Sequence, residues 1–138
     1  MNWKRIVAWS ALLIVLANGI GFLSGFILGK SEIHPDTISE LIENHRLFRR
    51  IAIGSVAVLC YWRLGAGTPN LRAFHIFAAF LLVQLFDIGL ALVLGAQFNE
   101  LFEPWAMFRS ILYAVAGYGL ARLSPNHSVR DFRSSPDA

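Results

Sequence analysis

The sequence predicts an all-α fold, namely a polytopic membrane protein built as a compact bundle of about four transmembrane helices plus a short amphipathic interfacial helix at about 37–50. Composition is the first observation behind this prediction. Of 138 residues, 56% are hydrophobic and 15% are charged, against roughly 45–50% and about 25% in ordinary soluble domains. The second observation is that long apolar runs alternate with short polar stretches. Such a chain has too few charges to cover a soluble globule, so its apolar excess requires lipid.

The first apolar segment lies at about 6–29, after the basic pair Lys4 and Arg5. At about 1.5 Å per residue it is long enough to cross a hydrocarbon core of about 30 Å. A signal peptide is the rival interpretation, because Val15-Leu16-Ala17 resembles a cleavage site. The apolar run continues well past that site. We therefore expect an uncleaved membrane anchor.

The main polar stretch contains a helix-start signal, in which Thr37 is followed three residues later by Glu40. One face of the helix that follows is apolar, with polar residues opposite it. The residues of this face are Ile38, Leu41, Ile42, His45 and Phe48. We expect an amphipathic helix that lies at the outer interface or runs straight into the second span. It carries an interfacial basic cluster near the headgroups, formed by Arg46, Arg49 and Arg50.

The second span, at about 47–64, is the shortest of the expected crossings. Only 51–62 is free of charge, which also suits a re-entrant segment. Two observations favour a full crossing: the flanking arginines can snorkel, and an even number of spans places both basic termini on one side. A glycine-rich turn then precedes a third span at about 73–95.

The fourth span, at about 105–123, follows an acidic loop without Lys or Arg. Residues 1–123 are thus predicted to form a single transmembrane domain, and the polar residues 124–138 a disordered cytoplasmic tail. Basic residues are biased toward the side that holds both termini, which predicts cytoplasmic termini. We expect a multi-pass protein of the bacterial inner membrane. The net charge of +3 lies in clusters between apolar runs, so nucleic-acid binding is not expected.

Four polar residues stand inside the expected spans, where such side chains are costly. They are Asn18, Gln84, Asp87 and Arg109. Counted from the cytoplasmic helix ends at 1.5 Å per residue, they lie at similar depths of about 17–21 Å. We expect one intramembrane polar cluster with an Asp87–Arg109 contact. The pair is either a structural ion pair that fixes helix register, or an ion- or proton-coupling site in which Asp87 titrates.

Three glycines follow Asn18 along one stripe of the first span, at Gly21, Gly25 and Gly29. This glycine zipper is a helix-packing signal, because small residues let another helix backbone approach closely. The stripe either packs against the third or fourth span of the same chain, or contacts a second copy or another membrane subunit.

The histidines do not form a haem or metal site. His45 is expected at the outer boundary and His75 at the inner start of the third span, so the two cannot share one iron. Cys60 is the only cysteine, which excludes an internal disulfide and a cysteine zinc site. No metal, cofactor or catalytic residue is predicted.

The leading functional hypothesis is a non-enzymatic subunit or interaction partner of a membrane assembly, with the lipid bilayer and a homo-oligomeric or other subunit as partners. The alternative is a small ion- or proton-coupled transporter or channel that uses Asp87 and Arg109. A third possibility is a membrane enzyme whose basic cluster, Arg46, Arg49 and Arg50, binds a lipid or an anionic cofactor.

Overall fold

The computed structural model describes residues 2–30, 38–95 and 104–124, and all regular structure in these residues is helical, which confirms the all-α prediction. The described residues form four α-helices and a short 3₁₀ helix. In chain order these are α1 (Trp3–Lys30), α2 (Ile38–Ala66), η2 (Pro69–Leu71), α3 (Arg72–Val93) and α4 (Pro104–Leu123).

Two arrangements were expected for the amphipathic segment at about 37–50, a helix at the interface or one that continues into the second span. The structure contains the second arrangement, because residues Ile38–Ala66 form one continuous helix, α2. No glycine or proline stands between Ile38 and Ile53, so nothing in the local sequence interrupts the helix. Thr37 lies outside the described residues. The remaining spans correspond to α1, α3 and α4.

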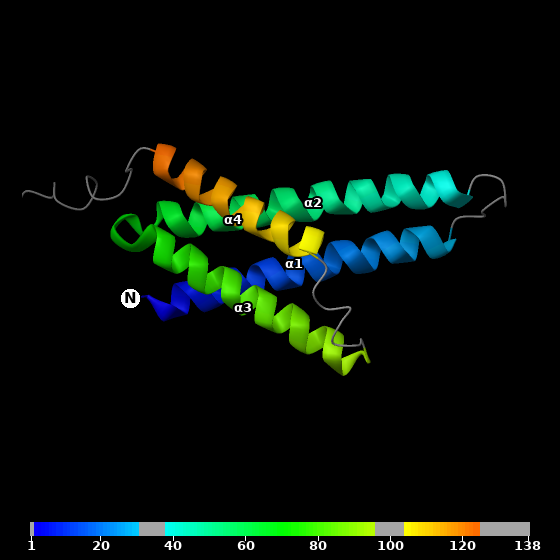
Figure 1. Cartoon of the computed structure of the whole chain (residues 1–138), viewed down its shortest axis with the longest axis horizontal. Helices are drawn as coiled ribbons and strands as arrows, with labels where there is room; N and C mark the ends of the chain where they lie inside the picture. Colours follow the sequence, from blue (N-terminus) through cyan, green and yellow to red (C-terminus); the bar gives the residue numbers. More distant parts are fainter. Residues whose placement is uncertain (1, 31–37, 96–103, 125–138) are drawn as a thin grey trace, which may run out of the picture.

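The helices alternate in direction along the bundle (Figure 1). The amino end of α1, the α2–α3 connection and the carboxyl end of α4 lie at one end, which we call the terminal end. The opposite end, where α1 finishes and α2 begins, is called the far end, and α3 finishes and α4 begins short of it. Because α1 and α3 run the same way and α2 and α4 run the other way, the described helices form an up-and-down arrangement.

The packed core lies in the terminal half of the bundle. It is formed by the first halves of α1 and α3 and the second half of α2, with residues Ile6, Leu13, Ala57, Cys60, Tyr61, Leu64, Ile76, Ala79, Phe80 and Val83. α2 contacts each of the other three α-helices, whereas α1 and α4 do not contact each other within the described residues. Toward the far end α3 diverges from α1 and α2 (Figure 1). The far halves of the helices therefore contribute little to the core.

Small residues bring α2 and α4 close together. A Cβ atom added to Gly117 would lie 2.5 Å from Cβ of Tyr61, and one added to Gly65 would lie 2.8 Å from Cβ of Ala121. Further toward the far end, a Cβ on Gly54 would lie 2.7 Å from Cζ of Tyr113. Each glycine thus leaves room for a partner on the other helix, which is how small residues permit close helix packing.

Two helices, α1 and α3, are long and apolar enough to cross a membrane. Of their most apolar windows, only 6% of the residues in α1 and 22% of those in α3 are buried inside the structure. The core helix of a soluble domain would bury most of such a stretch. These two helices instead turn most of their apolar surface outward.

Candidate functional site

The far half of α1 presents an open glycine face. A Cβ atom built on Gly21, Gly25 or Gly29 would meet no atom within 4 Å apart from the helix's own backbone and chain neighbours. Beside this stripe, Phe22 and Phe26 are 78% and 51% exposed, and their rings stack with centroids 6.5 Å apart. Intramolecular packing of the stripe, one of the two interpretations of the sequence, is not what the structure contains. The stripe borders an exposed apolar surface.

The glycines that do bring helices together were missed by sequence reasoning. They are Gly54 and Gly65 on α2 and Gly117 on α4. The spacing Gly117-x-x-x-Ala121 is a small-residue signal of the same kind as the stripe on α1. The sequence could show that both stripes suit close packing, but not which stripe has a partner in the same chain.

The four polar residues that were expected inside the spans all lie in the described helices, and no hydrogen bond or ion pair joins them. The side-chain amide of Asn18 donates to the Ile14 carbonyl of its own helix over 2.8 Å. Asp87 is exposed, whereas Gln84 and Arg109 are half-buried. The expected Asp87–Arg109 contact is therefore not made in the structure.

The reason lies in which helix α4 packs against. Arg109 stands one turn before Tyr113, whose ring packs on Gly54 of α2, so this face of α4 is directed toward α2 rather than α3. The groove between α3 and α4 runs along residues 73–80 and 111–118, short of both Asp87 and Arg109. The similar depths that the sequence predicts for Asp87 and Arg109 therefore do not place the two side chains at one interface.

The basic cluster lies along the exposed side of α2, where Arg46, Arg49 and Arg50 all face outward. Arg50 lines a groove of 580 Å³ together with Gly54, Ser55 and Tyr113. The cluster therefore lies in the first half of α2, and Arg50 also reaches the α2–α4 interface.

The terminal end is held together by polar contacts that sequence reasoning did not predict. Asn2 caps α1, because its Oδ1 accepts a hydrogen bond from the Arg5 amide over 3.2 Å. The Arg5 guanidinium donates from Nη1 to the Gly67 carbonyl over 2.9 Å. Buried His75 lies near the same end: its Nδ1 is 2.9 Å from the Leu71 carbonyl, and its Nε2 accepts from the Asn2 amide over 3.4 Å. His75 thus has a structural role, joining α3 to the start of α1.

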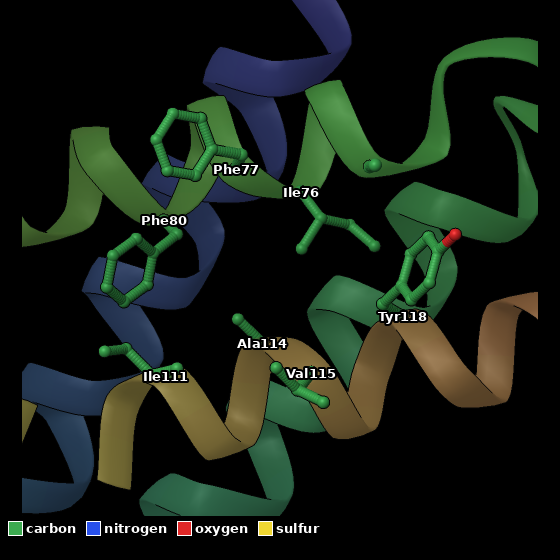
Figure 2. A pocket seen from close by; sticks show the side chains of 8 residues that line it. Ile76, Phe77, Phe80, Ile111, Ala114, Val115 and Tyr118 are labelled. Carbon is green, nitrogen blue, oxygen red and sulfur yellow. The ribbon is translucent and has the colours of Figure 1, made fainter. Parts of the chain in front are cut away.

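Two adjoining hollows lie between α3 and α4. One is an apolar groove of 380 Å³ (Figure 2), lined by Ala73, Ile76, Phe77, Phe80, Ile111, Ala114, Val115 and Tyr118. The other is a pocket of 390 Å³ at the terminal end, lined by Asn70, Leu71, Arg72, Ala73, Phe74, Tyr118 and Arg122. We call them the apolar groove and the basic pocket.

In the described part of the chain, no group of three or more His, Cys, Asp or Glu side chains is placed to hold a metal ion. No family model matches the chain, and neither a curated protein nor a solved structure matches it.

Proposed function

We propose that this chain is a small four-span protein of the bacterial inner membrane that works as a non-enzymatic subunit of a membrane assembly. In this proposal both termini are cytoplasmic, and the far half of α1 binds a transmembrane helix of a second copy or of another subunit. The observation that carries the proposal is the open face of Gly21, Gly25 and Gly29 on a helix that is apolar enough to cross a membrane.

The lengths and directions of the helices support four crossings. The shortest, α4, has 20 residues, which at 1.5 Å per residue gives about 30 Å, the thickness of a hydrocarbon core. α1 and α2 have 28 and 29 residues and can cross with tilt or extend beyond the core. The up-and-down arrangement gathers Arg63, Arg72 and Arg122 at the terminal end, together with the start of α1. This distribution suits a cytoplasmic terminal end.

α2 is less apolar than α1 and α3, but its position in the bundle supports a membrane crossing. α2 contacts all three other α-helices, so part of its surface meets protein instead of lipid. Its arginines at 46, 49 and 50 lie more than 20 Å from Ala66 along the helix at about 1.5 Å per residue, near the opposite boundary. Their long side chains can extend to the headgroups from there.

The open face of α1 supports association with another helix. Lipid and apolar side chains are equally apolar, so helices associate in a membrane through close packing at small residues. The three glycines on this face have free space in front of them, and the neighbouring Phe22, Leu23 and Phe26 are exposed. A helix that packs on this open glycine face would contact the α1 backbone and be flanked by these side chains.

Cysteine cross-linking in native membranes tests this association. In a Cys60→Ala background, Gly25→Cys should give a cross-linked product with a second copy under mild oxidation, or with another subunit after the thiol is labelled with a benzophenone maleimide and irradiated. The matched control is Leu85→Cys, since Leu85 is exposed on α3 and lies outside the α1 face. Mass spectrometry of the product distinguishes a second copy from another subunit. Equal yields from both positions, or no product from Gly25→Cys, would contradict the proposal.

Membrane topology is tested separately by thiol labelling in intact cells and inverted vesicles. In the same background, cysteines at Thr68 and Ser31 should be labelled from opposite sides, with Thr68 reached only from the cytoplasm. Labelling of both from one side would show that α2 does not cross.

Transport by Asp87 and Arg109 ranks below this proposal, because it requires the two groups to act together. Their side chains do not form an ion pair, and neither lines any of the three hollows described above. Enzymatic use of the basic cluster has even less support, since the described residues that line the groove at Arg50 include no histidine, cysteine or carboxylate that could activate the Ser55 hydroxyl.

A further inference from the structure

The apolar groove and the basic pocket between α3 and α4 form one continuous depression. Ala73 and Tyr118 line both of them. Figure 2 shows that the Tyr118 ring lies beside the apolar side chains, while its hydroxyl oxygen points away from them. Tyr118 therefore stands at the boundary between an apolar and a polar compartment, a position typical of tyrosine at a membrane interface.

The apolar groove is open along its length. Phe77 on α3 and Val115 on α4 line it, and each is 59% exposed. The groove follows α3 from Ala73 to Phe80, a rise of about 10 Å at 1.5 Å per residue. A narrow apolar ligand could enter sideways between the two helices.

The basic pocket has the chemistry of an anion site. Arg72 and Arg122 both line it, and none of the described residues that line it is a carboxylate. The pocket also covers the first turn of α3, whose N-cap residue, Leu71, makes no side-chain capping hydrogen bond. The amino end of a helix carries partial positive charge and free N–H donors. An anion in the pocket would be attracted by this partial charge and by the guanidinium groups that line it.

We propose that this depression binds one anionic glycerophospholipid of the leaflet at the terminal end. The phosphate lies in the basic pocket near Arg72 and Arg122, and an acyl chain runs along the apolar groove between Phe77 and Val115. The proposal rests on the membrane placement proposed above, but not on association through α1. Charge complementarity selects this occupant: a zwitterionic lipid would bring its own cation to a pocket that already holds two.

Native mass spectrometry of the full chain, released from detergent, tests the proposal. The purified protein is titrated with phosphatidylglycerol and, separately, with phosphatidylcholine. We expect one phosphatidylglycerol to be retained preferentially. Combining Arg72→Gln with Arg122→Gln should lower its occupancy roughly tenfold or more, as expected for two arginines near a membrane surface, with little change for phosphatidylcholine. The charge-matched control is Arg63→Gln, because Arg63 is exposed at the same end but lines neither hollow.

A second variant tests the acyl-chain part of the site while both arginines remain. Ala73→Phe should block the junction between the two hollows and reduce retention, whereas Ala116→Phe should not, because Ala116 is exposed on α4 outside both hollows. Since Ala73 is itself exposed, the substitution need not disturb the core. Retention that survives Ala73→Phe would overturn the proposed acyl-chain position.

Other outcomes also have defined meanings. Equal retention of the two lipids, or full retention after both arginine substitutions, would overturn the proposal. A shortened chain that ends at Ser124 is compared with the full chain. Binding of phosphatidylglycerol by the shortened chain alone would show that the tail, residues 125–138, occupies the site instead. The same spectra report the oligomeric state of the protein. If the chain does not associate through α1 but does bind lipid, the spectra show a monomer that retains phosphatidylglycerol. Recovery of the chain outside the membrane fraction would instead contradict the membrane placement.

Discussion

The guanidinium of Arg5 donates a hydrogen bond from Nη1 to the carbonyl oxygen of Gly67 over 2.9 Å, joining the first turn of α1 to the residue after α2. The guanidinium also occupies the space that a Cβ atom on residue 67 would need. Glycine at this position therefore lets the arginine lie directly against the backbone. This contact fixes the relative positions of two helix ends that are 62 residues apart.

Removing this contact from either side should have the same effect. Arg5→Gln removes the charged donor, and Gly67→Ala displaces the guanidinium, so each should lower the free energy of unfolding by about 1 kcal/mol. Because both act on one contact, the double variant should cost no more than the larger single effect. Denaturant titration in micelles measures this cycle, with Lys4→Gln as the exposed neighbouring control. Additive losses would show that the two residues act separately.

Gly117 should tolerate no side chain. A Cβ there would lie 2.5 Å from Cβ of Tyr61, 3.0 Å from the Val58 carbonyl oxygen and 3.1 Å from the Trp62 amide nitrogen. Since two of these neighbours are backbone atoms, the helices must move apart, and Gly117→Ala should cost roughly 1–3 kcal/mol.

The matched control for this variant is Gly119→Ala, two residues along the same helix, where an added Cβ meets nothing within 4 Å. Thermal denaturation followed by circular dichroism compares the two variants. Equal loss of stability in both would mean that α4 does not pack closely on α2 at Gly117.

Asp87 and Arg109 should be energetically independent in the monomer. The structure makes no ion pair between them although both lie in described helices, so Asp87→Asn and Arg109→Gln should have additive effects on stability within about 0.5 kcal/mol. Denaturant titration of the two single variants and the double variant measures the coupling. A coupling energy clearly above 1 kcal/mol would restore the predicted polar cluster and, with it, the case for transport.

Cys60 should report on the integrity of the core. Its side chain is only 5% exposed, so a maleimide should label it slowly in the folded protein and rapidly in denaturant. Labelling rates measured by mass spectrometry test this, and Asn70→Cys in a Cys60→Ala background gives the rate for an exposed position. Gly117→Ala should accelerate labelling of Cys60, because the adjacent Tyr61 is displaced by the same change. Fast labelling of the unmodified protein would contradict the packed terminal half.

The sequence by itself determined the helices. The apolar runs that predict spans at 6–29, 73–95 and 105–123 coincide closely with α1, α3 and α4, because hydrophobicity and helix propensity act over neighbouring residues and can be read locally. The continuation of the amphipathic segment into the apolar part of α2, one of the two expected arrangements, has a local reason as well. The charged residues in the first half of α2 require a polar environment. They do not interrupt the helix, because no glycine or proline stands among them.

Only the tertiary structure decided which helix packs against which. Two stripes of small residues look alike in the sequence, yet Gly117 fits against Tyr61 whereas Gly25 faces open space. Likewise, Asp87 and Arg109 were expected at similar depths, yet the face of α4 that carries Arg109 is directed toward α2 and not toward α3. Depth and periodicity describe each helix separately, while packing depends on the complementary shapes of two helices and on the angle at which they cross. Neither property is encoded in the pattern of a single helix.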